Sequence, residues 1–161
     1  DLTGTILIGA DLCNANLFGA DLSGVDLTGA NLVGADLSNS VLTGLDLTGT
    51  ILIGANLSNA NLTGVDLSGV DLTNVILVNA NLENATLEYT RLIDANLDSV
   101  NLTNANLRGA LLVDANLSNA ILMGADLTNA ILSGAILTGA NLENAVLTNA
   151  IPNCVGHPIC V

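Results

Sequence analysis

The residues that could carry chemistry in this 161-residue chain lie close together at its C-terminal end. Cys154 and Cys160 bracket the single histidine, His157, in a Cys-x2-His-x2-Cys arrangement. Two cysteines in so short a loop predict a disulfide that holds the end of the chain, which would indicate an oxidising compartment. The alternatives are two free thiols or a metal site, although structural zinc normally takes four protein ligands and this cluster supplies three.

The rest of the sequence offers little from which an active site could be built. It has no lysine for a Schiff base or a phosphate contact, and neither a Gly-x-Ser-x-Gly motif nor a phosphate-binding loop occurs. Carboxylates and hydroxyls are abundant but recur at fixed intervals, so a neighbouring pair is no sign of acid–base catalysis. We therefore expect a protein that is not an enzyme and that holds no cofactor and no metal.

The chain is built almost entirely from one short repeat. Leucine occupies every fifth position from Leu2 to Leu147, which makes 30 registers. The residue three positions after the leucine, two before the next leucine position, is Ala in 20 of 30 repeats, and Asp or Asn stands directly before the leucine in 19. Gly or Asn stands two residues after it in 26 of 30 cases, 15 of them Gly and 11 Asn.

A period of five excludes the straight regular structures. On an α-helix, leucines five apart step by roughly 140° and form no apolar stripe. On a straight strand they alternate between the two faces, which leaves half of them in water. One bend per repeat solves the problem, because Gly and Asn tolerate the positive φ of a turn and every leucine can then point to a common axis. The expected fold is an all-β solenoid with Leu and Ala inside.

This repeat resembles that of pentapeptide-repeat proteins over Asp1–Ala150. The resemblance implies a right-handed quadrilateral β-helix with four pentapeptides per coil, so thirty repeats would form about 7.5 coils. We expect residues 1–150 to form this β-helix and residues 151–161 to form a C-terminal capping tail. Pro152 and Pro158 lack the N–H that a backbone ladder needs, which favours an end of the stack there.

The charge balance narrows the partners. Fifteen Asp and Glu stand against Arg91 and Arg108, a net charge of −13, which argues against direct binding to nucleic acid or to an anionic membrane. No apolar run is long enough for a membrane span. The chain begins inside a repeat, from which we expect that a natural leader was removed and that the N-terminal coil is truncated or buried against another chain. The family is abundant in cyanobacteria, and with the disulfide this favours the periplasm or thylakoid lumen over the cytoplasm.

Residues 20 apart should stack if each coil holds four repeats, and two outward faces then stand out. An acidic column collects Asp26, Asp46, Asp66, Glu88 and Asp126. Such a column could bind cations or a basic partner, but the favoured interpretation is that each Asp bonds to the backbone of its own turn, as Asn would. Cys13 also occupies an outward position, where we expect an exposed free thiol.

A second face carries seven large aliphatic side chains, more than any other face. Contiguous exposed aliphatic surface usually marks a contact site, whereas the alternative is the general preference of β-branched residues for extended segments. We name this candidate contact face the aliphatic face; its residues are Val33, Ile51, Ile53, Ile93, Leu111, Val113 and Ile131.

These features predict a non-catalytic structural or protein-interaction module, a rigid acidic rod that presents faces to a protein partner. A homodimer would form through an open coil end or through the aliphatic face. The alternative comes from the resemblance, since some pentapeptide-repeat proteins mimic duplex DNA and bind DNA gyrase, inhibiting it or protecting it from quinolones. Duplex DNA carries roughly 21 charges over the rod's ~36 Å length. The present chain carries a net charge of −13 over the same length, which is a lower charge density, and its repeat register has no projecting loops.

Overall fold

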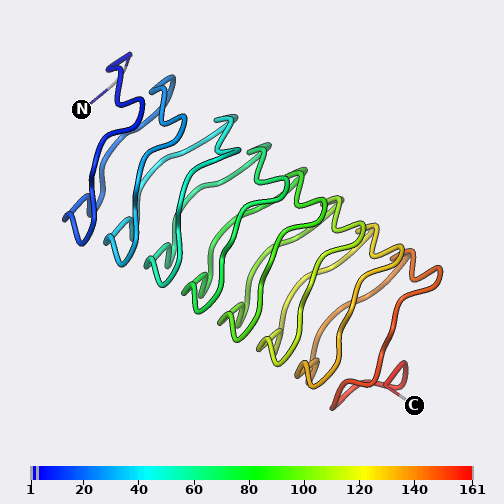
Figure 1. The fold of residues 1–161 in the computed structure, drawn as a ribbon. Coiled ribbons are helices and arrows are strands. Elements are labelled where there is room, and N and C mark those ends of the chain that lie inside the picture. The colour runs from blue at the N-terminus through cyan, green and yellow to red at the C-terminus, as the bar shows by residue number, and fades with distance from the viewer. Residues whose placement is uncertain (1, 3, 161) are drawn as a thin grey trace.

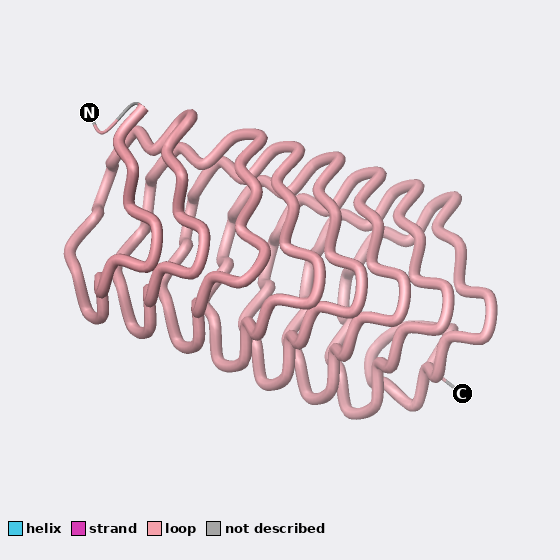
Figure 2. The backbone as a smooth tube through the Cα atoms, turned by 45° about the horizontal axis from the view of Figure 1, so that its top comes forward, coloured by secondary structure: helices cyan, strands magenta, loops and turns pink. Residues whose placement is uncertain are grey.

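The computed structural model describes residue 2 and residues 4–160. The chain winds as a stack of coils, with the N-terminus at one end of the stack and the C-terminus at the other (Figure 1). Parallel β-bridges join residues 20 apart, such as Asp11 with Asn31 and Leu111 with Ile131. Corners lie above corners along the stack (Figure 2). The 20-residue offset that the family resemblance implied is therefore the spacing between neighbouring coils.

Each side of a coil is too short to form a strand with bounds of its own. Within residues 4–149 every repeat supplies one isolated bridge residue, directly before the leucine, and two turn residues directly after it. Main-chain hydrogen bonds nonetheless run between coils, for example from Leu77 N to Asn96 O at 2.7 Å and from Asn96 N to Val75 O at 2.9 Å. The described residues include no helix with the length and apolar character of a membrane span.

The corners are β-turns that require a left-handed residue. The carbonyl of each leucine accepts a hydrogen bond from the N–H three residues on, as Leu77 O does from Ala80 N at 3.0 Å. The third residue of the turn has a positive φ in every repeat from Gly4 to Asn149, as a type II turn demands. This requirement explains why Gly or Asn fills the position. The four residues that take the same conformation without being Gly or Asn are Tyr89, Asp94, Ser99 and Asp114.

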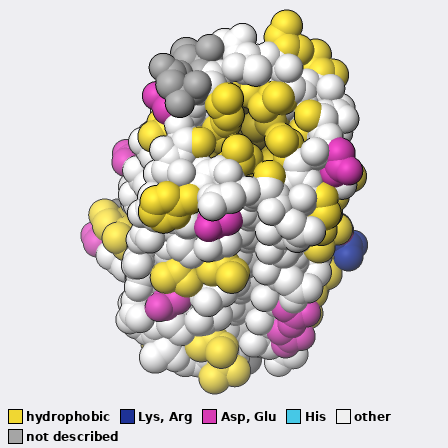
Figure 3. Space-filling model, turned by 90° about the vertical axis from the view of Figure 1, so that its left-hand side faces the viewer, with side chains coloured by type: hydrophobic (Ala, Val, Ile, Leu, Met, Phe, Trp, Pro, Cys, Tyr) yellow, Lys and Arg dark blue, Asp and Glu magenta, His cyan; other side chains and the backbone are white. Residues whose placement is uncertain are grey.

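The leucines line the axis of the stack, as the sequence predicted. All 24 repeat leucines from Leu22 to Leu137 are at most 1% exposed, and the residues two positions before them are buried beside them from Val25 to Ala135. The leucines of the first and last coils are only partly buried, and hydrophobic side chains gather on the end of the molecule that carries the N-terminus (Figure 3). Side chains alternate along the short extended segments, so both inward positions of a repeat reach the same core.

Hydroxyl side chains enter this core only where a carbonyl can accept their proton. Ser40 and Thr50 donate to the carbonyls of Leu37 and Leu47, each three residues earlier. Thr90 is fully buried and donates to Leu67 O of the preceding coil at 2.9 Å. No buried side-chain N or O of the described residues lacks a partner, which matters because an unpaired buried polar group costs about 1–3 kcal/mol.

The ladder continues past the last leucine into the tail. Ile151 forms a bridge with Ile131, and Val155 forms one with Ile136, an offset of 19 residues instead of 20. The tail is thus one residue shorter than a repeat here, and Cys154 takes the inward position that Ala holds elsewhere, only 9% exposed. Pro152 stands where the repeats have leucine, whose N–H donates to the next coil. The proline removes that donor, so the tail offers no such bond to a further coil.

Candidate protein-interaction faces

The outward Asp and Asn residues bind the backbone of their own turns. Each described Asp or Asn that precedes a repeat leucine accepts a hydrogen bond from the N–H two residues later, as Asp26 Oδ1 does from Thr28 N at 3.0 Å. Where that second residue is Ser or Thr, its hydroxyl often donates to the same oxygen, at 2.7 Å for Thr28. Asn61 makes the same two bonds with Thr63. These are the turn bonds that the favoured interpretation of the acidic column expected.

The acidic column nonetheless places carboxylates on successive coils. Asp46 and Asp66 form a bridge pair on adjacent coils. The hydroxyl and the N–H of Thr28 hold the pKa of Asp26 below its usual range. The same two groups of Thr48 lower the pKa of Asp46, although burial and the charge of Asp26 act in the opposite direction. The turn bonds thus favour the charged form at neutral pH.

The other two members of the acidic column have side-chain partners on a neighbouring coil. Glu88 Oε1 accepts a hydrogen bond from Asn106 Nδ2 at 2.8 Å. Asp126 Oδ2 lies 3.0 Å from Arg108 Nη1, in a solvent-exposed ion pair. Among the described residues, Asp26, Asp46 and Asp66 have no cationic partner, whereas Asn106 and Arg108 contact the carboxylates of Glu88 and Asp126.

The residues of the aliphatic face are partly accessible to solvent. Ile51 and Ile53 are 43% and 36% exposed, and the remaining five members are half-buried or partly exposed. Leu111 forms a bridge with Ile131, so these side chains stack on adjacent coils. The face is not purely apolar, because Asp71 and Arg91 share it and form an ion pair of 3.2 Å.

Tyr89 is the residue that the sequence reasoning overlooked. It is 70% exposed and holds a φ of +56° at a corner where most other repeats have Gly or Asn. A Cβ added to Gly109, at the same corner one coil on, would lie 2.6 Å from two ring carbons of Tyr89. The aromatic ring therefore lies over Gly109. The sequence contained a sign that Tyr89 is unusual, since an aromatic residue occupies a turn position that favours Gly and Asn.

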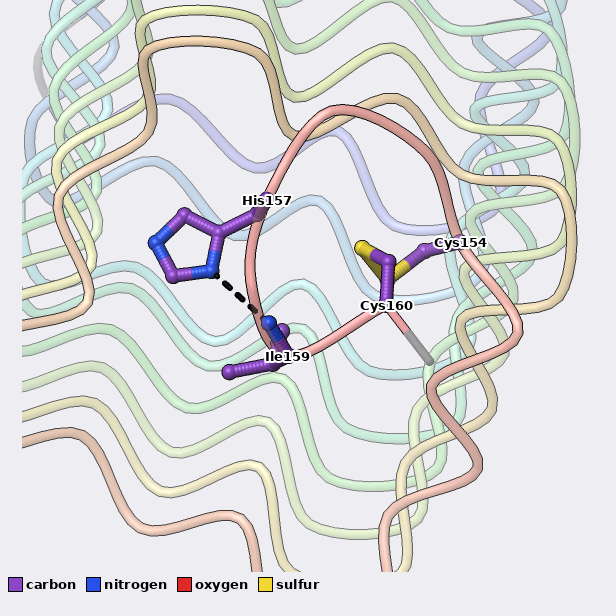
Figure 4. The surroundings of a disulfide bond; sticks show 4 residues. All are labelled: Cys154, His157, Ile159 and Cys160. Atoms are coloured by element: carbon purple, nitrogen blue, oxygen red, sulfur yellow. Dashed lines mark hydrogen bonds between the residues drawn. A yellow bond between two sulfur atoms is a disulfide. The ribbon is translucent and has the colours of Figure 1, made fainter.

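The tail carries the disulfide that the sequence predicted, between Cys154 and Cys160 (Figure 4). Since both sulfurs are bonded to each other, neither is a thiolate that could bind a metal. His157 turns its Nδ1 towards the N–H of Ile159, which donates to it at 3.4 Å. Ile159 and Cys160 pack against the core, which covers part of the last coil. Cys13 is a free, exposed thiol, as expected.

Over residue 2 and residues 4–160, the surface has no pocket and no group of three metal-ligating side chains. The site residues therefore belong to open faces of a stack rather than to a cleft.

Comparison with known proteins places the repeat in a family. The family described as pentapeptide repeats matches in eight copies, over residues 1–32, 30–69, 42–77, 66–104, 76–112, 101–139 and 132–151. This chain belongs to the pentapeptide-repeat family. The comparison with curated protein sequences returned no match. Members of the family act in general as structural or protein-binding modules.

Solved pentapeptide-repeat proteins are similar to this chain, and those with a TM-score of 0.50 share its fold. The protein Rfr23 from the cyanobacterium Cyanothece 51142 is 36% identical, with a TM-score of 0.50 over 81% of this chain and 90% of that one. HetL from Nostoc sp. strain PCC 7120, a protein involved in the regulation of heterocyst differentiation, is 29% identical, with a TM-score of 0.42 over 97% and 91%. QnrB1, a plasmid-mediated fluoroquinolone resistance protein, is 19% identical, with a TM-score of 0.50 over 92% and 78%. These neighbours are right-handed β-helices.

Proposed function

We propose that this pentapeptide-repeat protein is a non-catalytic interaction module, a rigid acidic rod that presents its outward side chains to a protein partner. The observation that carries the proposal is the division of labour within each repeat. The leucine and the small residue fill the core, and the Gly or Asn makes the turn. Only the two outward positions of each side are free to vary, and they vary in groups: a charged column on one side and the aliphatic face on another.

The scaffold suits this role because its faces do not deform independently. The offset of 20 residues supports four repeats per coil, and thus a quadrilateral prism of about 7.5 coils. Each outward side chain then sits on a short segment bonded to the coils before and after it. Residues held on such rigid elements lose little freedom on binding, which favours affinity.

Mimicry of duplex DNA at gyrase is the alternative function. Its support is the row of aspartates Asp26, Asp46 and Asp66 on successive coils, since a regular row of negative charge is what a DNA-binding groove recognises. Against it, Arg108 offsets Asp126, and the repeat register contains no projecting loop. We expect no effect on supercoiling by gyrase, with or without a quinolone, at micromolar protein. Inhibition or quinolone protection that disappears when the aspartates are replaced by Asn would establish the mimic instead.

Two variants test the proposed function and divide it between the faces. In the first, Asp26, Asp46, Asp66 and Asp126 are replaced by Asn, which keeps the turn bonds because Asn already makes them elsewhere. In the second, Ile53, Ile93 and Val113 are replaced by Glu. A partner retained by the parent protein should be lost from one variant while thermal unfolding of both remains cooperative. Retention by both folded variants would exclude these faces as its binding site.

We further propose that the protein works outside the cytoplasm, in a periplasm or a thylakoid lumen. The support is the Cys154–Cys160 disulfide, since such bonds persist in oxidising compartments. The similarity to a cyanobacterial protein agrees with this proposal. Alkylation of the native protein before and after reduction, in separated cell fractions, tests it. An intact tail thiol pair in the cytoplasmic fraction would contradict it.

A further inference from the structure

The aliphatic face has a pair of opposite charges near its centre. Asp71 and Arg91 occupy the same outward position on adjacent coils, and Arg91 Nε lies 3.2 Å from Asp71 Oδ2. Both remain accessible, with 49% of the Arg91 side chain and 37% of the Asp71 side chain exposed. One coil beyond the pair in each direction, the same position holds Ile51 and Leu111. The ion pair is thus flanked by one aliphatic side chain on each side along the rod.

This arrangement is self-complementary when two rods lie antiparallel. A two-fold axis between two facing copies, at right angles to the rods, reverses the order of the coils but keeps each position within its coil. An axis midway between Asp71 and Arg91 sets each arginine opposite the aspartate of the other copy. The same register brings together the aliphatic pairs Ile51 with Leu111 and Ile53 with Val113.

The corner residues beside the face also agree with this register. It sets Asp94 opposite Asn74 and Asp114 opposite Gly54, so no acidic corner faces another at the centre. A two-fold axis parallel to the rods would instead exchange the two positions within each coil. Arg91 would then lie opposite Ile93 and lose a charged partner on the other copy. Arg91 would keep only its intramolecular pair with Asp71 there, whereas the antiparallel register adds charge pairs between the two copies and is therefore favoured.

Charge also favours this face over the side that holds the acidic column for contact between two acidic rods. Its outward strand positions carry Asp11, Asp71 and Arg91, a formal sum of −1. The side that holds the acidic column carries five carboxylates against Arg108, a formal sum of −4. Two copies with a net charge of −13 each repel least where the facing surfaces are nearly neutral. The acidic column lies on the neighbouring side of the coil, because its repeats directly precede those of the aliphatic face, so contact through the aliphatic face leaves the column uncovered.

We propose that the aliphatic face binds a second copy of this chain in an antiparallel, two-fold dimer centred on Asp71 and Arg91. This goes beyond the proposed function and does not depend on it, because self-association needs no other partner. The dimer displays two acidic columns on the same side, because the axis keeps each position within its coil, and this gives a partner two equivalent surfaces.

The first test compares one substitution on the face with the same substitution off it. Ile53 and Ile121 are 36% and 40% exposed, and only Ile53 lies on the aliphatic face. Ile53→Glu and Ile121→Glu add the same charge to a similarly exposed position. Sedimentation over a concentration series should give a dimer for the parent and for Ile121→Glu, and a dissociation constant at least roughly tenfold higher for Ile53→Glu. A monomeric parent, or equal loss in both variants, would overturn the proposal.

The second test exploits the crossed charge pairs. Arg91→Asp and Asp71→Arg each set like charges against each other across the proposed axis, so each variant alone should be monomeric. A mixture of the two restores both contacts. The introduced arginine of one variant meets the introduced aspartate of the other, and the native Asp71 of one meets the native Arg91 of the other. We expect the mixture to form a heterodimer. If the folded variants stay monomeric when they are mixed, the proposed register is wrong. Mixing two variants can restore a charge pair between copies, but it cannot restore a pair that exists only within one chain.

Discussion

Leu77 and Ile76 form a matched pair for testing the inward register. They are isomers at adjacent positions, yet Leu77 is fully buried and Ile76 is 39% exposed. Replacement by Ala removes three carbon atoms in each case, so the two variants differ only in the side of the coil from which those atoms are lost.

The magnitude follows from burial. Truncating a fully buried leucine loses its transfer free energy and leaves a cavity that the stacked coils cannot close, a cost of about 2–5 kcal/mol. Truncating Ile76 loses part of an exposed surface and should cost less than about 1 kcal/mol. Leu77→Asp should prevent folding, because the carboxylate would be buried beside apolar side chains with no cation in reach.

Chemical denaturation of the purified variants, followed by far-ultraviolet circular dichroism, measures both changes. The ratio between the two losses of unfolding free energy is the informative quantity, since errors in the extrapolation affect both variants alike. Equal losses for Leu77→Ala and Ile76→Ala, or a cooperative transition for Leu77→Asp near that of the parent, would refute the inward assignment.

Three further predictions concern the tail, the turns and the exposed tyrosine. Reduction of the Cys154–Cys160 bond should lower stability by up to about 2 kcal/mol, because the closed loop is short; in the unreduced native protein only Cys13 should be alkylated, and three alkylated thiols would contradict the bond. Acid should destabilise the fold: hydrogen bonds from Ser or Thr lower the pKa of Asp26, Asp36 and Asp46 in the folded state, so the stabilisation present above their ordinary pKa is lost as the pH falls through the folded value. Replacing these three by Asn should flatten stability between about pH 5 and pH 2, and an unchanged slope would show that the turn bonds do not stabilise the carboxylates. Gly109→Ala should be more destabilising in the parent than in a Tyr89→Asn background, by about 1 kcal/mol, because the new Cβ meets the tyrosine ring; additive effects in a double-mutant cycle would mean that the ring does not rest there in solution.

The sequence predicted those features that one repeat dictates. A leucine at every fifth position can point inward in every repeat only if the chain bends once per repeat, and the Gly and Asn two residues later mark that turn. Both the core and the corners therefore follow from the spacing. The number of repeats per coil does not follow from the spacing. Turn residues determine where the chain bends, but not the bend angle, which sets how many repeats complete one coil. That number came from the family resemblance, and the bridge offset agrees with it.

Departures from the repeat were harder to predict. The tail could be expected to end the stack because of Pro152, but the loss of one residue before Val155, with Cys154 moved inward, depends on how the disulfide and the last coil pack together. Tyr89 kept the register, so its turn was predictable, whereas the contact of its ring with Gly109 was not. Stacking also decides which charges meet: the Asp71–Arg91 pair follows from the 20-residue offset once that offset is known.

The most direct test of the interaction role is a side-by-side capture experiment in the source cell extract. The bait proteins are the parent, the variant with four Asp→Asn replacements and the variant with Glu at Ile53, Ile93 and Val113, each first shown to unfold cooperatively. Quantitative mass spectrometry of the retained proteins should find at least one partner that the parent binds and one variant does not. If every protein retained by the parent is retained equally by both folded variants, the outward faces do not bind a partner and the central claim fails.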